Sequence, residues 1–498
     1  MRLCAWVLLV GVLLGGQVVW LYALRGPALL AREAVLIWGQ VVLAAAALGM
    51  LGLLKTTPGD AIRLSGRVSA WVIVGGTVML QATAVVLLAP LLSDDLSRYR
   101  LDGRMWTCGV SPYSTTPEEF AYPLTDPLDA MVPYRDWHTI YPPVSQAVFA
   151  GARWLDNAIN PPGKKWLSAS PGSWRAGVLE PEALRRTRVF RGVFALFAVG
   201  AVIVLVRALG KAGQSVWYAA VLGWNPLFTL ESGAMGHQDA IGLFFVAAAL
   251  AAVASRHFNR AGAALALACG VKPLAVLLLP FLWRQTHEEH DFRAGRKMVL
   301  LFGATFAVVY IPALLVQNGW VGWRQTVGQF SRSWEANGLF YESFKALFGQ
   351  GDAGRQMERA KDAARLFAAI AALGMGLLLW QSRARLAEAG YWVMLILLLF
   401  APLVYPWYLL WVLVFIPMLR GPQGFTGLAW TATASMSYTL WRNAPWTWEV
   451  PPAWMAAQYL PVLCVLAVEV ARLARVVPLG RGLEAAAPRS RGKTVPDR

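Results

Sequence analysis

Two adjacent carboxylates, Asp94 and Asp95, follow an apolar run at 68–92 that is long enough to cross a membrane. Ionisable side chains next to a bilayer are costly to place and mark functional sites. A carboxylate there can act as a general base toward a hydroxyl group of a substrate held at the membrane surface. Helix capping is the structural alternative, because Asp is a favoured N-cap. More polar and aromatic residues follow the pair: Arg98, Tyr99, Asp102, Arg104 and Tyr113.

Three further polar and aromatic patches interrupt the apolar sequence, at 224–240, 331–344 and 405–411. The last patch contains Trp407 and Tyr408, which fit either a sugar-stacking surface or an interfacial aromatic belt. The first patch fits either a catalytic cluster or a buried hydrogen-bond network. It places two acids and an imidazole between two apolar runs: Glu231, His237 and Asp239.

A lysine, Lys272, stands inside the apolar run 261–283 beside Pro273. It can face the same cavity as the carboxylates, or it can extend along the apolar surface toward water. Cations can bind and stabilise a leaving phosphate, and the candidates for this role are Arg98, Arg104, His237 and Lys272. The candidates for other substrate contacts are Tyr99, Asp102, Tyr113, Tyr141, Glu231, Asp239, Trp407 and Tyr408.

The composition indicates which fold positions these residues. The chain has 498 residues, of which 57% are hydrophobic and only 15% are charged. A soluble protein has about 25% charged residues. Repeated runs of roughly 18 or more apolar residues predict membrane-spanning helices. We therefore expect an all-α polytopic membrane protein with roughly 12–14 transmembrane helices and a periplasmic loop region that contains short helices.

The basic residues beside the apolar runs predict the orientation, because cytoplasmic loops are rich in Lys and Arg. With the N-terminus inside, Asp94 and Asp95 lie at the outer face. Residues 141–155 read as a short amphipathic or re-entrant helix, and 261–283 as one kinked span or two half-helices. The expected organisation is a single transmembrane domain (1–471), a first outer loop (93–186), a second outer loop (317–361) and a basic, disordered cytoplasmic tail (472–498).

The net charge of +17 does not indicate a nucleic-acid partner, because the basic residues lie mostly in short loops beside spans. The four cysteines are scattered and predict no disulfide framework. No Cys or His cluster has the spacing of a zinc site. Asp94 and Asp95 leave a divalent cation open as a cofactor, although two carboxylates are few ligands for a dedicated site.

The segment SDDLSRYRLDGRMWTCGVSPY at 93–113 resembles the first-loop signature of bacterial GT-C glycosyltransferases, in particular the polyprenyl-phosphate-mannose-dependent mannosyltransferases. Later pieces occur in the matching order, so the resemblance covers most of the chain. They are IYPPVSQ at 140–146, WNPL and GHQDA within 224–240, VKPLAVLLLP at 271–280, NGLFYESF at 337–344 and PWYLLW at 406–411. Leu101 and Gln238 depart from the family pattern, which often has Trp and Asn there.

This resemblance implies an inverting transfer of a hexose from a polyprenyl-phosphate donor to a glycan or glycolipid acceptor. Mannose is the favoured candidate for the hexose. In that family an Asp of the first outer loop is the general base, and Asp95 matches it better than Asp94. The His and acid of that family's GHxD-like turn map onto His237 and Asp239, in the patch at 224–240. The implied location is the cytoplasmic membrane, with the active site on its periplasmic or extracellular side.

Two alternatives stay open at this stage. The same fold can use another lipid-phosphate sugar, such as glucose, arabinose or an aminosugar. A lipid-linked glycan flippase or other transporter would also expose charged residues to lipid-borne substrates. A transporter is expected to place its charges at mid-depth of the spans, whereas the charges here concentrate at one face.

Overall fold

The chain folds almost entirely into helices. The computed structural model describes residues 2–25, 32–56, 65–122, 127–130, 132–160, 181–316, 318–348, 353–439 and 451–476. Within these ranges the backbone is α-helical with short 3₁₀ and π segments, and the β contacts are two isolated bridges to Leu403. The all-α class predicted from the apolar runs is confirmed.

Seven helical segments in the described ranges are long and apolar enough to cross a membrane. At about 1.5 Å per residue, the 22 residues of α4 extend about 33 Å, which matches a hydrocarbon core of roughly 30 Å. The chain is therefore a polytopic membrane protein, as predicted. The helices that contain these segments are α1 (Arg2–Gly11) continued by α2 (Gln17–Ala23), α3 (Glu33–Thr56), α4 (Gly66–Leu87), α8 (Pro181–Lys211), α14 (Phe292–Leu315), α17 (Ala353–Gln381) and α22 (Pro452–Val476).

The other apolar runs form shorter helices, so fewer helices meet the length of a full span than the 12–14 expected. Proline is the main physical reason, because it removes a backbone donor and ends a helix. The run at 214–231 breaks at Pro226, and the run at 406–418 starts with a 3₁₀ turn at Pro406. The short elements are α9 (Tyr218–Gly223), α10 (Pro226–Thr229), α11 (Asp239–Ala254), α18 (Leu386–Phe400), α19 (Leu410–Leu413) and α20 (Phe425–Thr433).

The segment around Lys272 is broken into two half-helices, which decides between the two readings of 261–283. Helix α12 (Phe258–Cys269) ends before the lysine, and a 3₁₀ turn (Pro273–Leu278) leads into α13 (Leu279–Glu289). Lys272 itself has extended backbone angles. Irregular backbone within a membrane protein is tolerated where it lines a cavity, which is where Lys272 lies.

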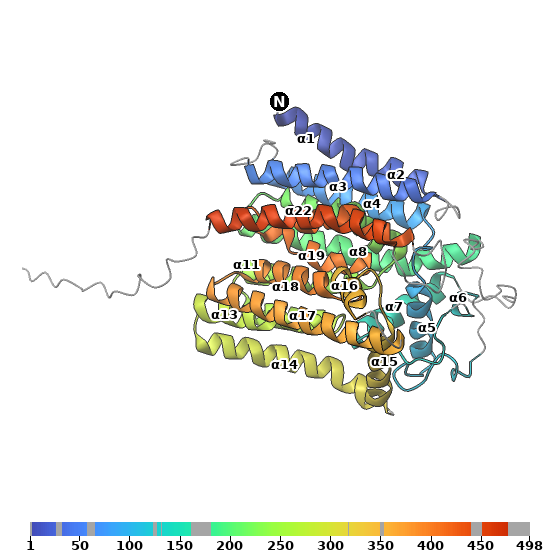
Figure 1. Cartoon of the computed structure of the whole chain (residues 1–498). Coiled ribbons are helices and arrows are strands. Elements are labelled where there is room, and N and C mark those ends of the chain that lie inside the picture. The colour runs from blue at the N-terminus through green and yellow to red at the C-terminus, as the bar shows by residue number, and fades with distance from the viewer. Residues whose placement is uncertain are drawn as a thin grey trace, which may run out of the picture.

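The long helices lie side by side along one common direction, and short helices gather at one end of this bundle (Figure 1). We call this the capped end. It carries α5 (Asp95–Thr107), α6 (Pro127–Ala130) and α7 (Pro143–Ile159) from the expected first outer loop, and α15 (Gly319–Ser333) from the second. Helix α7 begins with Pro143 in its first turn and confirms the amphipathic helix expected at 141–155.

The opposite end, where α3 ends and α4 begins, carries many cations, and we call it the basic end. Side-chain hydrogen bonds join separate segments at this end. Arg256 bonds to the Glu289 carbonyl oxygen, and Arg284 bonds to the carbonyl oxygens of Leu379 and Trp380 in α17. The cations at this end include Lys55, Lys211, Arg256, Arg284, Arg383, Arg385, Arg420 and Arg472.

Helices α5 and α7 pack closely at the capped end because Gly103 has no side chain. A Cβ atom at Gly103 would lie 2.4 Å from the Phe149 carbonyl oxygen. The Tyr99 ring stacks on Phe149 with 4.6 Å between ring centroids, and both side chains are buried. This contact fixes α5, and with it the first residue of that helix, Asp95.

The last described helix, α22, continues through Val476, past residue 471 where the transmembrane domain was expected to end. The remainder of the expected basic tail, 477–498, lies outside the described residues. The four cysteines are free thiols.

Candidate active site

A cavity of about 410 Å³ at the capped end collects the residues that the sequence singled out. Its walls come from the start of α5, the loop before α7, the break at Lys272, helix α15 and the 405–408 segment. The predicted site residues that line it are Asp94, Asp95, Arg98, Tyr99, Tyr141, Asp239, Lys272, Trp407 and Tyr408. Segments separated by more than 300 residues, such as those with Asp94 and Tyr408, thus meet around one space.

Asp95 is the first residue of α5, and its carboxylate is partly open to the cavity, with 29% of the side chain exposed. The Tyr99 hydroxyl donates to its Oδ2 at 3.2 Å. Burial, reinforced by the charge of Asp95, raises the pKa of the Tyr99 phenol well above its usual value, so this hydroxyl keeps its proton. Asp94 precedes the helix, but its side chain makes no capping hydrogen bond. A simple capping role therefore does not account for Asp94.

His237 lies behind Asp95, between two carboxylates. Its Nδ1 is 3.6 Å from Asp95 Oδ2, and its Nε2 is 3.3 Å from Glu231 Oε2, although neither contact has hydrogen-bond geometry. The ring stacks on Trp407 with centroids 3.9 Å apart. Glu231 is fully buried and accepts a 2.6 Å hydrogen bond from the Tyr438 hydroxyl. Neither His237 nor Glu231 is among the residues that line the cavity. His237 contacts two residues that do, Asp95 and Trp407, and Glu231 lies behind His237.

The backbone that presents His237 is unusual. A π-helical turn (Leu230–Met235) ends at Gly236, whose φ of 72° lies in the left-handed region that glycine adopts without strain. A Cβ atom there would lie 2.7 Å from Arg191 Cγ. Arg191 Nη1 donates to the carbonyl oxygens of Leu88 at 2.7 Å and Ala234 at 3.1 Å. This buried arginine, which the sequence did not single out, joins the end of α4 to the turn that carries His237.

Lys272 forms a charged pair at the edge of the cavity. Its Nζ is 2.7 Å from Asp239 Oδ1, and the same oxygen accepts a 2.6 Å hydrogen bond from Trp411 Nε1. The ammonium also lies 3.7 Å from the centroid of the Tyr408 ring, a favourable cation–π distance. Asp239 is buried, whereas 19% of the Lys272 side chain is exposed. The lysine is therefore available to a ligand, and Asp239 holds it in place.

Arg98 is the second cation in the cavity wall. Its Nε donates to Asp102 Oδ1 at 2.7 Å, and its Nη2 donates to the Trp137 carbonyl oxygen at 3.0 Å. Asp102 is completely buried and also accepts a 2.7 Å bond from the Gln146 side chain. Asp102 thus orients Arg98 and does not line the cavity.

Two other predicted site residues do not line the cavity. Arg104 pairs with Asp129 at 2.9 Å, a contact between α5 and α6 that does not face the cavity. Tyr113 is buried and donates a 2.7 Å hydrogen bond to the carbonyl oxygen of Tyr141. Both side chains support the loops around the cavity.

Sequence reasoning missed an aromatic wall of the cavity. Tyr134, Trp137 and Trp334 contact one another with ring centroids 4.6–5.4 Å apart, and Trp334 packs on Phe330 of α15. The only sequence signal for this wall was the density of aromatic residues in the two loops that were expected to be outside. His138 also lines the cavity, and burial lowers the pKa of its imidazole below the usual 6.5. Within the described residues, no group of three or more His, Cys, Asp or Glu side chains is arranged to hold a metal ion.

The comparison with protein families connects this geometry to a reaction class. The model of Glycosyltransferase family 87 matches residues 176–406. The matched region contains Glu231, His237, Asp239 and Lys272, and the Asp94–Asp95 pair precedes it. No curated protein matches the chain. The family match, together with several helices able to cross a membrane, supports a membrane glycosyltransferase.

Proposed function

We propose that the protein is a GT-C-type glycosyltransferase that moves a hexose from a polyprenyl phosphate to a glycan or glycolipid acceptor, with inversion at the anomeric carbon. Mannose is the favoured candidate for this hexose. One observation carries this proposal. The partly exposed carboxylate of Asp95 opens into a cavity that also holds two cations, Arg98 and Lys272, and an aromatic wall. A base, phosphate-binding cations and sugar-stacking surfaces are the groups that this transfer needs.

Asp95 is proposed to take the proton of the acceptor hydroxyl. Its Oδ2 already accepts a bond from Tyr99, whereas no described residue donates a hydrogen bond to its Oδ1. Oδ1 is therefore the oxygen that meets the acceptor. The deprotonated acceptor oxygen forms a bond to the anomeric carbon from the face opposite the phosphate. The bond from that carbon to the phosphate oxygen breaks, and its electron pair leaves with the lipid phosphate.

The departing phosphate gains negative charge, which a positioned cation stabilises most where water is scarce. Lys272 and Arg98 are the cations in the cavity wall, and Asp239 and Asp102 hold them in fixed positions. Because each cation already has a carboxylate partner, the empty cavity carries less net positive charge than two free cations would give it. This arrangement favours a monoanionic phosphate diester over a highly charged phosphate.

A lipid donor fits the remaining cavity wall. Apolar side chains from the break after α12 and from α15 form a continuous part of it: Val271, Pro273, Trp323, Val327 and Phe330. These groups can contact an isoprenoid chain near its phosphate. Water-soluble nucleotide sugars have no such apolar part.

The distribution of charge supports an orientation of the protein in the membrane. The basic end is rich in Lys and Arg, and such ends face the cytoplasm. The capped end then faces the periplasm or the outside of the cell. We propose a location in the cytoplasmic membrane, with the cavity open to its outer face.

The test is a donor panel with purified wild-type protein in detergent and a mixed glycolipid acceptor extract. Polyprenyl-phosphate-linked mannose, glucose, arabinose and an aminosugar are supplied separately, each with a labelled sugar. A labelled product with one donor supports the proposal and identifies the sugar. A parallel arm in proteoliposomes measures movement of the same lipids across the bilayer. Movement without any transfer product would replace the enzyme by a transporter.

A further inference from the structure

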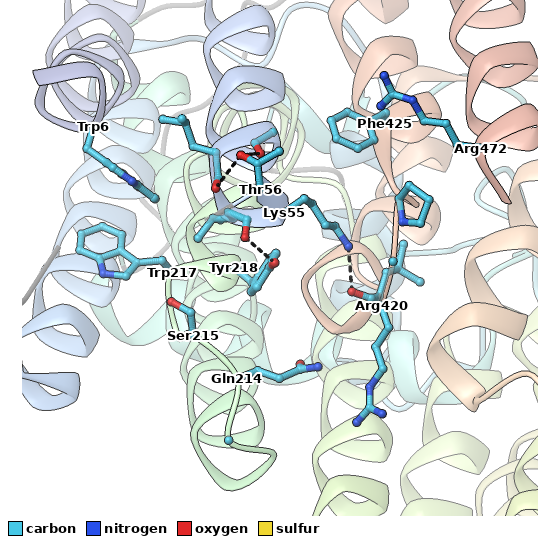
Figure 2. A pocket seen from close by; sticks show the side chains of 17 residues that line it. Trp6, Lys55, Thr56, Gln214, Ser215, Trp217, Tyr218, Arg420, Phe425 and Arg472 are labelled. Atoms are coloured by element: carbon cyan, nitrogen blue, oxygen red, sulfur yellow. Dashed lines mark hydrogen bonds between the residues drawn. The ribbon is translucent and has the colours of Figure 1, made fainter. Parts of the chain in front are cut away.

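A second cavity, of about 870 Å³, lies at the basic end of the bundle (Figure 2). Its walls come from α1 at Trp6, the end of α3 at Lys55, the segment before α9 at Gln214, and α22 at Arg472. Asp95 lies beyond the opposite end of α4, about 33 Å away along that helix. The proposed transfer therefore uses no residue of this cavity.

The charged side chains in its wall all have the same sign. Lys55, Arg420 and Arg472 line it, and no Asp or Glu is among its described lining residues. Lys55 Nζ donates one hydrogen bond, to the Leu419 carbonyl oxygen at 2.9 Å (Figure 2). Within the described part of the chain, the Arg420 and Arg472 guanidinium groups have no hydrogen-bond or ion-pair partner, and both residues are exposed. Three cations without a lining carboxylate favour an anionic ligand.

Two buried hydrogen-bond donors in the same wall lack acceptors. The indole nitrogens of Trp6 and Trp217 are buried, and neither has a hydrogen-bond partner in the described structure. The two rings lie against each other with centroids 5.5 Å apart. A buried donor without a partner is unfavourable, so an oxygen-rich ligand that accepts these bonds would be stabilised. Phosphate and ester oxygens both accept hydrogen bonds from indole N–H groups.

The rim of the cavity continues into surface that faces lipid. Val468 precedes Arg472 by one helical turn on α22, and 53% of its surface is exposed. On the other side, Val7 and Leu8 follow Trp6 on α1, and each is 66% exposed. A lipid whose anionic headgroup enters the cavity here can thus keep its hydrocarbon chains in contact with both α1 and α22. A free inorganic anion, by contrast, has no part that contacts these surfaces.

We infer that this cavity binds the phosphate-bearing headgroup of an anionic glycerophospholipid from the leaflet at the basic end. Arg420 and Arg472 contact the phosphate, the indole groups donate to its oxygens or to ester oxygens, and the acyl chains lie along α1 and α22. Basic pockets between membrane helices recognise lipid headgroups in this way. The inference does not depend on the sugar-transfer reaction, because it concerns the other end of the molecule.

The test is native mass spectrometry of the full-length protein in a neutral detergent. Phosphatidylglycerol, zwitterionic phosphatidylcholine and inorganic phosphate are titrated separately. We expect saturable binding of phosphatidylglycerol by the wild type and weaker binding of phosphatidylcholine. Arg420→Gln/Arg472→Gln should weaken phosphatidylglycerol binding on the order of 30-fold, as expected for two cations near a membrane surface. The matched control, Arg293→Gln/Arg296→Gln, removes two exposed cations of α14 that do not line the cavity and should bind as the wild type does.

A second variant separates a specific site from general surface charge. Trp6→Phe/Trp217→Phe keeps two rings and removes both indole donors, so it should also weaken binding while the net charge stays constant. Equal binding by the wild type and the Arg420→Gln/Arg472→Gln variant would overturn the inference. An equal loss in the α14 control would overturn it as well, because the effect would then come from overall charge. Displacement of the lipid by millimolar inorganic phosphate would assign the cavity to a free anion instead.

Discussion

Replacing Lys272 by methionine tests whether its ammonium serves the reaction or only the fold. Lys272→Met keeps a similar chain length but removes the cation that lies 2.7 Å from the buried carboxylate of Asp239. That carboxylate would keep only the bond from Trp411 Nε1. A buried charge that loses its partner destabilises a protein by about 3–5 kcal/mol, and the partial exposure of Lys272 favours the lower value, about 3 kcal/mol.

A paired variant separates this structural effect from catalysis. In Lys272→Met/Asp239→Asn neither member of this pair carries a charge, and the amide oxygen can still accept the bond from Trp411. Most of the lost stability should therefore return. Transfer activity should stay about 100-fold below the wild type, because loss of one charge-stabilising group typically lowers kcat by about 10²–10³-fold.

The assay measures both quantities on the same preparations. Tryptophan fluorescence in detergent gives the melting temperature, and initial rates at saturating donor give kcat. Lys272→Met alone should lower both values, and the paired variant should recover only the melting temperature. If the paired variant recovers activity together with stability, Lys272 has a purely structural role and the phosphate-binding assignment is wrong.

Three other variants give separate tests. Tyr99→Phe removes the hydroxyl that donates to Asp95, so kcat should fall about tenfold, the equivalent of roughly 1.4 kcal/mol for one hydrogen bond. The melting temperature should change little. An unchanged kcat would show that Tyr99 does not orient the base. Gly236→Ala forces a Cβ atom against Arg191 at a left-handed φ, so stability should fall by about 1–3 kcal/mol and activity with it. The control Gly192→Ala lies in α8 at a position with open space, so activity should stay unchanged and stability should rise by about 0.5–1 kcal/mol. Burial lowers the pKa of His138 below 6.5 in the folded protein, so the unfolded chain binds a proton on this imidazole at a higher pH than the folded chain does. Stability should therefore decrease as the pH falls through about 6.5. His138→Gln should reduce the decrease in melting temperature between pH 7.5 and 5, and parallel curves of melting temperature against pH for the wild type and the variant would contradict the argument.

The sequence predicted those parts of the site that lie where an apolar run stops. Asp94 and Asp95 follow a span, and Lys272 interrupts one, so each was visible as a polar residue at a helix end or break. The order of the motifs also brought Asp239 and Tyr408 into consideration. All five side chains line one cavity in the structure.

Other features depend on contacts between distant segments, and the sequence did not reveal them. Arg104 has the residue type of a phosphate ligand, but a partner 25 positions later, Asp129, neutralises it outside the cavity. Trp334 reaches the loop at 134–138 only because α15 folds across the capped end. No periodicity encodes such a contact. Fewer described segments than expected reach the length of a full span for the same reason, since continuous apolar composition at 214–231 concealed the break at Pro226.

The most direct test of the account compares sugar transfer by wild type, Asp95→Asn and Asp136→Asn with the donor identified in the panel. Asp136 is an exposed carboxylate at the same capped end that does not line the cavity, so it controls for loss of an acid nearby. The account predicts labelled product with the wild type and Asp136→Asn, and a loss of at least about 10²-fold with Asp95→Asn at an unchanged melting temperature. Near-normal product with Asp95→Asn would contradict the assignment of Asp95 as the base.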